Sequence, residues 1–423
     1  MFRLLHCADL HLDSPFLGMA QLDSEMSEQL RESTFQSFRK IVDYAINQKM
    51  DLVTVAGDVY DSADHGLHSV VRFRDQLKRL SEAKIPCCIV AGNHDPLKSR
   101  RQGASLPQGC HLFGDKPERW EIDRDASSKV GVYGVSFPVS AVKKNLALQL
   151  ADCYRAGPGL HLALLHCNLG SHSGHDNYAP CSLDELRATP FNAWLLGHVH
   201  EHKLISKADP LIVYPGNIQG RHIRESGQRG ASLITFHDQG DPEHEFIPTA
   251  EVIWSTGETS IENIDTMEEL VERIDDQFEN LLDKEPDART LVVRWRLINR
   301  GPLHHELSRS GVEELIEIIR KKWRDHATPV LIEKLNDDTM PAIDLDELRQ
   351  QNSFSSMVLV AARDFETDPV EQERLLNDLA RLRNHKGLRK YLVNFESKME
   401  NDPQFLKKIL ERSALHAINA MIE

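Results

Sequence analysis

The chain has 423 residues and a formal net charge of −15, and 40% of its residues are hydrophobic and 27% charged. This composition is typical of a globular protein of about two to three domains, and it excludes a largely disordered chain, a collagen and a coiled-coil rod. No apolar run approaches the roughly 18 residues of a membrane span, and acidic residues interrupt the first apolar stretch too early for a signal peptide. The seven cysteines form no CxxC pair, which favours reduced thiols. We therefore expect a soluble cytoplasmic protein.

The negative charge is concentrated in the second half of the chain. Residues 251–423 hold 35 acidic and 24 basic residues, a net charge of −11, which leaves −4 for residues 1–250. An acidic protein has little bulk attraction for nucleic acid, so any DNA contact must come from local basic groups or from metal ions. Sixteen of the 21 histidines lie in residues 1–250. Metal chemistry is therefore expected in this first part.

Residues 1–250 alternate short apolar runs with longer amphipathic segments. The runs predict strands over 2–6, 52–56, 87–91, 130–135, 160–165 and 193–196, with later strands over 214–216 and 231–236. Apolar residues at helical spacing predict helices over 24–48 and 64–83. This alternation predicts an α/β domain in which helices pack outside a sheet.

The second half has a different pattern. Helices are predicted over 264–282 and 311–323 and strands over 291–297 and 330–335, which together would make a small α+β cap domain. Beyond residue 344 strand signals fade, and helices are expected over 369–384 and 403–422. We therefore expect three parts, namely residues 1–250, 251–343 and a helical C-terminal region over 344–423.

Five polar motifs each follow a predicted strand, and they are Asp9-Leu10-His11, Gly57-Asp58, Gly92-Asn93-His94-Asp95, His166 and Gly197-His198-Val199-His200. Ligand-binding groups collect at the carboxyl ends of strands in an open α/β sheet. A single such pair is usually a solvated turn, and a lone strand-end histidine is usually structural. The five motifs together, each at a strand end, indicate one convergent site.

The residue types of these motifs indicate a metal site. Carboxylate, imidazole and amide oxygen without thiolate suit Mn²⁺, Fe²⁺ or Zn²⁺. Seven such groups exceed the needs of one ion, whereas two ions that share Asp58 would use all of them. Glycines 57, 92 and 197 would let the backbone approach the ligands closely.

The motif order DxH, GD, GNHD, H, GHVH resembles the signature of the calcineurin-like metallophosphoesterases. That resemblance implies a four-layer sandwich, two central sheets flanked by helices, that holds two metal ions and hydrolyses phosphoesters. The segments LLHCADLHLDSPF, VAGDVYD, VAGNHD, LLGHVHEHK and VYPGNIQGRHIRESGQRG resemble the SbcD-type nucleases of DNA double-strand break repair, in particular their bacterial YhaO-like subgroup. The motifs cover about residues 1–250, and the rest fits only by size and order of elements.

The resemblance also implies roles for single residues. One metal ion would be held by Asp9, His11, Asp58 and His200, and the second by Asp58, Asn93, His166 and His198. His94 would be the catalytic histidine, with Asp95 orienting its ring, and Arg221 and His222 would contact substrate. Some relatives have a second histidine three residues after the GD aspartate, where this chain has Asp61.

The implied function is a Mn²⁺-dependent DNA exonuclease or endonuclease that cleaves phosphodiester bonds by a two-metal mechanism in DNA repair. A small-molecule phosphodiesterase or a protein phosphatase of the same superfamily is the alternative. A scaffold without activity is disfavoured, because every expected ligand is present. Lys98, Arg100 and Arg101 follow the GNHD motif, where they would meet a DNA backbone or form an ordinary solvated loop.

Three kinds of partner follow from the same resemblance. The chain has no Walker A pattern, so an ATP-regulated nuclease would need a separate SbcC/YhaN-like coiled-coil ABC-type ATPase. The apolar stripe of the last helix, from Leu406 to Ile422, would join the core or bind that partner. The other partners are DNA and a second copy in a homodimer, and no membrane contact is expected.

Overall fold

The structure is a computed structural model that describes residues 1–12, 14, 16, 24–61, 66–99, 105–123, 129–170, 178–342 and 353–367, with a few isolated positions beyond residue 347. The chain divides into two compact units. The first comprises residues 1–257, 276–295 and 318–334, and the second comprises residues 258–275, 296–317 and 335–423.

The first unit contains a six-stranded sheet whose order is β12-β11-β1-β2-β3-β4. The strands β1 (Phe2–Cys7), β2 (Leu52–Ala56), β3 (Cys87–Val90) and β4 (Cys110–Leu112) are parallel. The strand β11 (Gly230–Phe236) pairs antiparallel with β1, and β12 (Glu243–Pro248) pairs antiparallel with β11.

A second six-stranded sheet has the order β5-β6-β7-β8-β10-β9. Its parallel strands are β6 (Lys129–Gly134), β7 (Leu160–His166), β8 (Ala193–Gly197) and β10 (Leu211–Tyr214). Antiparallel strands close both edges, β5 (Glu118–Asp123) beside β6 and β9 (Lys203–Ser206) beside β10.

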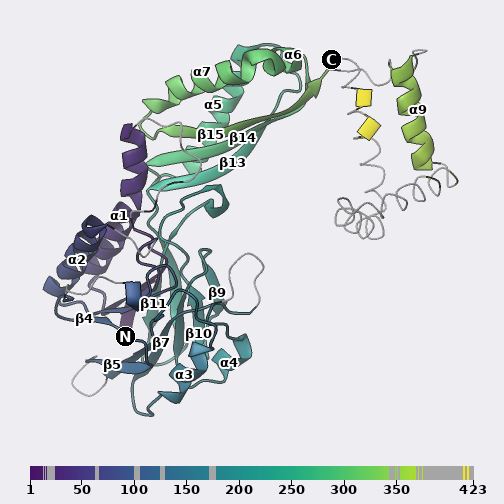
Figure 1. Ribbon diagram of the computed structural model, residues 1–423. Helices are drawn as coiled ribbons and strands as arrows, with labels where there is room; N and C mark the ends of the chain where they lie inside the picture. Colours follow the sequence, from purple (N-terminus) through teal and green to yellow (C-terminus); the bar gives the residue numbers. More distant parts are fainter. Residues whose placement is uncertain are drawn as a thin grey trace. The chain divides into compact units, whose positions relative to one another are not determined.

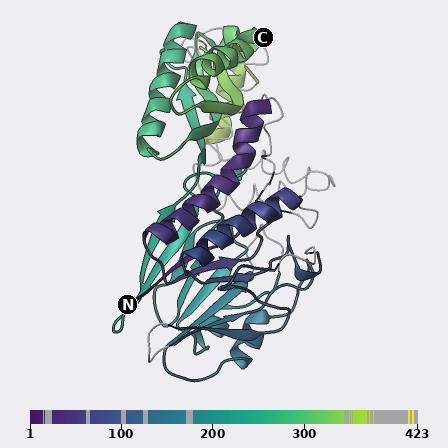
Figure 2. The same ribbon diagram turned by 90° about the vertical axis from the view of Figure 1, so that its left-hand side faces the viewer.

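Three apolar cores join these sheets and their helices into four layers. Between the sheets, Leu4 and Val90 of the first sheet share a core with Leu164 of the second. The helices α1 (Ser24–Asn47) and α2 (Leu67–Glu82) lie side by side on the outer face of the first sheet (Figures 1 and 2). The shorter helices α3 (Leu146–Asp152) and α4 (Leu183–Arg187) cover the outer face of the second. The predicted four-layer α/β sandwich is confirmed.

A three-stranded sheet of order β13-β14-β15 follows in the chain. The strands β13 (Val252–Ser260), β14 (Thr290–Gly301) and β15 (Val330–Pro341) each begin in the first unit and end in the second. The helices between them are α5 (Met267–Lys284), the short α6 (His304–Glu306), and α7 (Val312–Arg324) after a π-helical turn. This order of elements agrees with the expected α+β cap.

The helix α9 (Phe354–Thr367), which was not predicted, belongs to the second unit. Its Leu359 packs against Ala414 and Ile418. Apart from isolated positions, the helices expected over 369–384 and 403–422 lie outside the described residues. All seven cysteines are free thiols. Among the described helices, none combines the length and the apolar character that a membrane crossing requires.

Candidate metal centre

The carboxyl ends of five parallel strands bring the predicted ligands together. In the first sheet, Asp9 follows β1, Asp58 follows β2 and Asn93 follows β3. In the second sheet, His166 is the last residue of β7 and His198 comes directly after β8. The loops after β1 and β2 are tied by hydrogen bonds from the backbone N–H of Asp9 to Gly57 O (3.1 Å) and from that of His11 to Asp58 O (3.0 Å).

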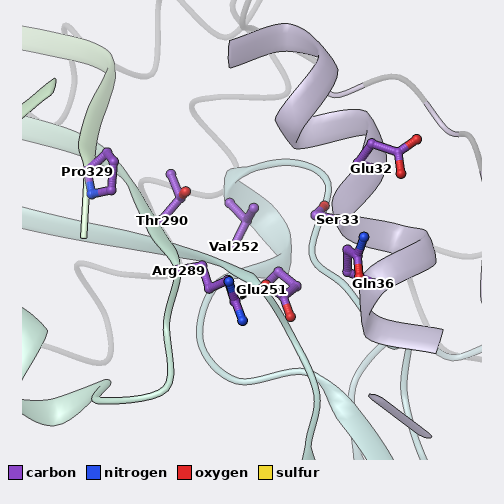
Figure 3. Close-up of a pocket in the computed structure, with 8 residues that line it drawn as sticks. All are labelled: Glu32, Ser33, Gln36, Glu251, Val252, Arg289, Thr290 and Pro329. Atoms are coloured by element: carbon purple, nitrogen blue, oxygen red, sulfur yellow. Dashed lines mark ion pairs between the residues drawn. The ribbon is translucent and has the colours of Figure 1, made fainter. Parts of the chain in front are cut away.

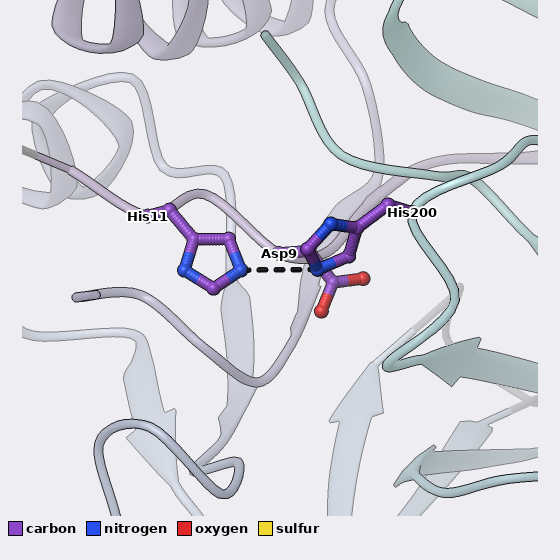
Figure 4. Close-up of side chains that lie close together, drawn as sticks. All are labelled: Asp9, His11 and His200. Carbon is purple, nitrogen blue, oxygen red and sulfur yellow. Dashed lines mark hydrogen bonds between the residues drawn. The ribbon is translucent and has the colours of Figure 1, made fainter. Parts of the chain in front are cut away.

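One group of candidate ligands consists of Asp9, His11 and His200 (Figure 4). Their nearest ligand atoms all lie within 4.8 Å of one another, and Asp9 and His11 are buried. The Nε2 atoms of His11 and His200 face each other at 3.2 Å. The two rings meet edge to face with centroids 5.0 Å apart.

A carboxylate lies close to the Nδ1 atom of each of these two rings. Nδ1 of His11 lies 3.0 Å from Oδ1 of Asp61, and Nδ1 of His200 lies 2.6 Å from Oε1 of Glu225. An ionised carboxylate only accepts hydrogen bonds, so the Glu225 contact places the ring proton of His200 on Nδ1, whereas Nδ1 of His11 lies close to Asp61 without hydrogen-bond geometry. With the ring proton on Nδ1, each Nε2 presents a lone pair to a metal ion. Two nitrogen ligands about 2.1 Å from one divalent ion lie about 3.0 to 3.4 Å apart in tetrahedral or octahedral geometry. The observed pair therefore fits a bound metal ion.

The charge states agree with this arrangement. Burial would raise the pKa of Asp61 and of Glu225, but contacts with His11 and His200 and the charge of Arg221 outweigh it and hold both pKa values well below the usual range. Burial lowers the pKa of His11 to about 3, and the charge of Arg221 is the second cause of this lowering. The two carboxylates are thus ionised and the His11 ring is neutral at neutral pH.

A second group consists of Asp9, Asp58 and His166, and a third, less buried group of His11, Asp61 and His94. Nε2 of His166 lies 3.4 Å from Oδ2 of Asp58 and 2.9 Å from Oδ1 of Asn93. Its Nδ1 donates to the carbonyl of Ala56 at 2.9 Å, which directs Nε2 toward the second group. The His198 ring lies edge-on to the His166 ring with centroids 5.2 Å apart. All seven predicted ligands are therefore brought together.

Asp9 belongs to both the first and the second group, whereas the resemblance gave the bridging position to Asp58. Oδ1 of Asp58 accepts the backbone N–H of His94 at 2.9 Å. Both carboxylate oxygens of Asp9 accept the backbone N–H of His198, at 3.1 and 3.0 Å.

This second group attracts positive charge. Burial raises the pKa of Asp9 to about 6. At Asp58 the charge and the hydrogen bond of His166 outweigh burial, and the pKa lies well below the usual range. The same contacts, acting against burial, raise the pKa of His166 to about 9. With its oxygen and nitrogen donors, the group fits a divalent cation.

Four of these residues have a left-handed backbone although none is glycine. Their φ angles are 50° at Asp9, 42° at His11, 48° at Asp58 and 100° at His198. Such conformations cost free energy for residues with a side chain, and they occur mainly at functional sites.

The three glycines of the motifs are required by close packing, as predicted. A Cβ on Gly92 would lie 2.2 Å from Oδ1 of Asp58, and one on Gly197 would lie 1.8 Å from the carbonyl oxygen of Ala56. Gly57 has a φ of +85°, and a Cβ there would lie 2.3 Å from Nδ1 of His166.

The catalytic candidate His94 is exposed at the edge of the cluster. Its ring lies edge-on to that of His11, with centroids 5.0 Å apart. Its Nδ1 donates to the backbone carbonyl of Asp61 at 2.7 Å. The resemblance had assigned the orienting of this ring to Asp95. The buried Asp95 carboxylate accepts the backbone N–H groups of Gly92 (3.0 Å) and Val59 (3.2 Å) and so joins the loops after β2 and β3, and its orienting role stays a prediction.

The two expected substrate contacts lie beside the first group. Arg221 donates through Nη1 to Asp61 Oδ1 at 2.6 Å, and its side chain is only 11% exposed. The ring of His222 accepts the backbone N–H of Arg224 at 3.2 Å, with Nε2 3.5 Å from Glu225. Sequence reasoning missed Glu225 as a partner of His200. The only signal for it was an acidic residue four positions after Arg221.

A separate cavity of about 480 Å³ lies in the first unit between α1 and the starts of β13 and β14 (Figure 3). Its carboxylate Glu251 is paired with Arg289 at 2.9 Å and with Lys40 at 2.8 Å. None of the seven candidate metal ligands lines this cavity.

Comparisons with known proteins identify the family. The sequence profile described as calcineurin-like phosphoesterase matches residues 2–202, and that of the metallophosphoesterase YhaO middle domain matches residues 254–340. The chain therefore belongs to the calcineurin-like metallophosphoesterases, a family of phosphoester hydrolases with a dimetal centre. It is 30% identical over 346 residues to the "Uncharacterized metallophosphoesterase YhaO" of Bacillus subtilis (strain 168), an alignment that covers 81% of this chain and 83% of that protein.

More distant relatives carry the name "DNA double-strand break repair protein Mre11". The protein of Methanosarcina mazei is 24% identical over 341 residues, which cover 76% of this chain and 52% of that protein. The protein of Sulfurisphaera tokodaii is 27% identical over 269 residues, which cover 59% of this chain and 62% of that protein.

Proposed function

We propose that this metallophosphoesterase is a Mn²⁺-dependent DNA nuclease that cleaves phosphodiester bonds during double-strand break repair. The observation that carries the proposal is the cluster of seven ligands, with the lone pairs of His11 and His200 directed at one point. The relatives named as double-strand break repair proteins support DNA as the substrate.

The chemistry divides between the metals and the protein. Two bound divalent ions would lower the pKa of water and neutralise charge on the phosphate oxygens. The chain holds the ring of His94 by the bond from Nδ1 to the Asp61 carbonyl, which leaves Nε2 to face the substrate. In its protonated form, His94 can donate from Nε2 to the departing oxygen. The backbone bond to Asp58 Oδ1 keeps His94 beside the metal ligands.

Exposed lysines in the loops that follow β3 and β6 support a polyanionic substrate. Phe137 lies edge-on to the ring of His166, with centroids 5.5 Å apart, and the carbonyl of the next residue, Pro138, accepts the backbone N–H of Lys98 at 3.3 Å. Lys98, Lys143 and Lys144 are exposed, and the described residues provide no ion-pair partner for them. Arg100 and Arg101 lie outside the described residues.

The first experiment measures Mn²⁺-dependent degradation of end-labelled duplex DNA by the wild-type chain and by Asp58→Ala. We expect cleavage by the wild type and none by the variant. If the wild type hydrolyses bis(p-nitrophenyl) phosphate or a phosphomonoester but leaves DNA intact, the small-molecule phosphodiesterase or phosphatase alternative holds instead.

The lysines permit a sharper test of the substrate class. Lys143→Ala/Lys144→Ala should lower DNA affinity and reduce the slope of log affinity against log salt by about 2, because each phosphate contact contributes about 0.9. Hydrolysis of bis(p-nitrophenyl) phosphate should not change. Lys207→Ala is the matched control. Lys207 lies before the start of β10, at the end of the parallel strands opposite the carboxyl ends that carry the metal centre.

His94→Ala tests the assigned proton donor. We expect a loss of about 10²- to 10⁴-fold in kcat, the usual contribution of a general acid. Manganese content measured on the same sample must stay at the wild-type level. Full activity with both ions bound would remove His94 from the mechanism.

We further propose that a coiled-coil ABC-type ATPase of the SbcC/YhaN kind binds this chain through its C-terminal helices. The described helix α9 exposes the apolar side chains of Phe354 (67%), Met357 (65%) and Val360 (47%). Purification from native cells should recover a large coiled-coil protein with the wild type. Met357→Glu/Val360→Glu should lose it, and a nuclease that always elutes alone would contradict the proposal. A homodimer is the other assembly that we predict, and light scattering of the purified chain would detect it.

A further inference from the structure

We propose that Arg221 is a positioning residue of the metal centre. This proposal rests on the proposed function, because that function requires bound metal ions. With Asp61 and Glu225, Arg221 forms a charged bracket that fixes the rings of His11 and His200. This role differs from the substrate contact that the sequence resemblance implied for Arg221.

The guanidinium of Arg221 joins the two carboxylates of the bracket. Nη1 donates to Oδ1 of Asp61 at 2.6 Å and to Oγ of Ser14 at 2.9 Å. Nη2 lies 3.7 Å from Oε1 of Glu225, and the backbone N–H of Arg221 donates to Oε2 of Glu225 at 2.8 Å. The two carboxylates beside the metal-facing imidazoles are therefore held by one cation, which offsets one of their two negative charges.

The oxygen atoms that receive these bonds show how the bracket acts. Oδ1 of Asp61 is the atom that contacts both Arg221 and Nδ1 of His11. Oε1 of Glu225 lies near both Arg221 and Nδ1 of His200. Without the guanidinium, Asp61 would lose its ion pair and Glu225 one of its two cations, the other being Arg229, so both carboxylates would be drawn more strongly toward water and away from their imidazoles. The rings would then lose the orientation that brings their Nε2 atoms to 3.2 Å.

The same contacts make Arg221 a poor substrate ligand. Its side chain is 11% exposed, whereas Arg224, in the short helical turn Ile223–Glu225 that follows, is exposed. A phosphate could take Nη1 only by displacing Asp61 and Ser14, and that would release the His11 ring.

The experiment measures Mn²⁺ binding to the full chain by titration calorimetry and by the manganese retained after gel filtration. The variants are Arg221→Met, Asp61→Asn and Glu225→Gln, with Arg187→Met as the matched control at an exposed arginine of α4. We expect wild type and control to bind two ions. Each bracket variant should weaken one of the two sites by about 10- to 100-fold, the usual effect of removing a group that orients a metal ligand, and leave the other unchanged. Arg221→Lys, which keeps the charge, should recover part of the lost affinity.

Two outcomes would overturn the proposal. In the first, Arg221→Met binds both ions with wild-type affinity and raises KM for bis(p-nitrophenyl) phosphate at unchanged kcat, which would make Arg221 a substrate contact. In the second, Arg221→Lys binds Mn²⁺ no better than Arg221→Met. If Arg221→Met does not fold, Asp61→Asn replaces it as the test variant, because the Asp61 side chain is 35% exposed. A chain that binds two ions but cleaves no DNA would refute the nuclease proposal and leave this one to be decided by the metal affinities.

Discussion

At the scale of single residues, the absence of a side chain at Gly92 is as necessary for the centre as the ligands are. A Cβ there would meet both the carboxylate oxygen and the backbone nitrogen of Asp58, at 2.2 and 2.7 Å. Neither atom can move without disturbing a metal ligand that is itself buried.

We therefore predict that Gly92→Ala lowers both Mn²⁺ affinity and phosphodiesterase activity by at least about 10-fold, the lower bound for disturbing a group around a metal site. Calorimetry and hydrolysis of bis(p-nitrophenyl) phosphate measure the two effects. Gly157→Ala is the control, because a Cβ at Gly157 would meet nothing within 4 Å. Equal behaviour of the two variants would contradict the prediction.

The sequence was informative about ligands and less informative about what orients them. Asp9, Asp58 and His166 could be predicted, because each follows an apolar strand at a place where chemistry requires a polar group. The pairing of His200 with Glu225 depends on the path of the loop after β10, and no local pattern specifies that path. The contact between His94 and the carbonyl of Asp61 involves a backbone atom, which carries no sequence signal.

At the scale of elements, a buried histidine links strands of the two sheets. His6 in β1 is fully buried, with Nδ1 2.9 Å from Oγ1 of Thr54 in β2 and Nε2 3.1 Å from the carbonyl of Leu196 in β8. Burial lowers its pKa to about 3, against the hydrogen bonds to Leu196 and Thr54. The imidazole is thus neutral in the folded chain and titrates near 6.5 in the unfolded one.

The unfolded chain therefore binds a proton at His6 between pH 6.5 and pH 3 that the folded chain does not. Stability from this residue is complete above pH 6.5 and is lost as the pH falls toward 3. We predict that metal-free wild type loses about 1 kcal/mol more unfolding free energy than His6→Gln between pH 7.5 and 5.5. Urea unfolding at both pH values measures this, and equal losses would show that His6 is protonated in the folded state.

Strand prediction succeeded for the central strands except β10 and failed for the edge strands. The central strands β2, β7 and β8 are buried on both faces, so they read as continuous apolar runs. The edge strands β4, β5, β9 and β12 are largely half-buried or exposed and have no such run, and they were missed. The strand predicted over 214–216 was wrong, because β10 ends at Tyr214, directly before Pro215, which has no N–H to donate.

At the scale of the whole molecule, the candidate metal ligands come from both sheets. Asp9 and Asp58 belong to loops of the first sheet, and His166 and His198 to the second. Bound ions would therefore connect the two sheets across the top of their shared core. Ions that bind only the folded chain must stabilise it.

We predict that saturating Mn²⁺ raises the melting temperature by several degrees over chelator-treated protein. Binding at 100 times Kd contributes about 2.7 kcal/mol for each site. Scanning calorimetry with Mn²⁺ and with EDTA measures the shift, and Asp58→Ala should lose most of it. An equal shift in that variant would indicate that the ions bind elsewhere.

Large-scale organisation was only partly accessible to sequence reasoning. The change in pattern after residue 250 marked the start of the cap sheet, whose predicted strands were too short because charged residues such as Arg300 and Asp338 extend β14 and β15 beyond their apolar starts. The boundaries at residues 250 and 343 stay predictions.

The left-handed backbone at Asp9, His11, Asp58 and His198 has a consequence for how this protein could be engineered. Glycine would relieve the backbone strain at each of these positions, but it would also delete a candidate metal ligand and, at Asp9 and Asp58, the carboxylate that accepts a backbone N–H. A library screened in the presence of a chelator for heat resistance alone is free to lose these side chains. Selection for catalysis has to preserve four unfavourable conformations that selection for durability need not retain.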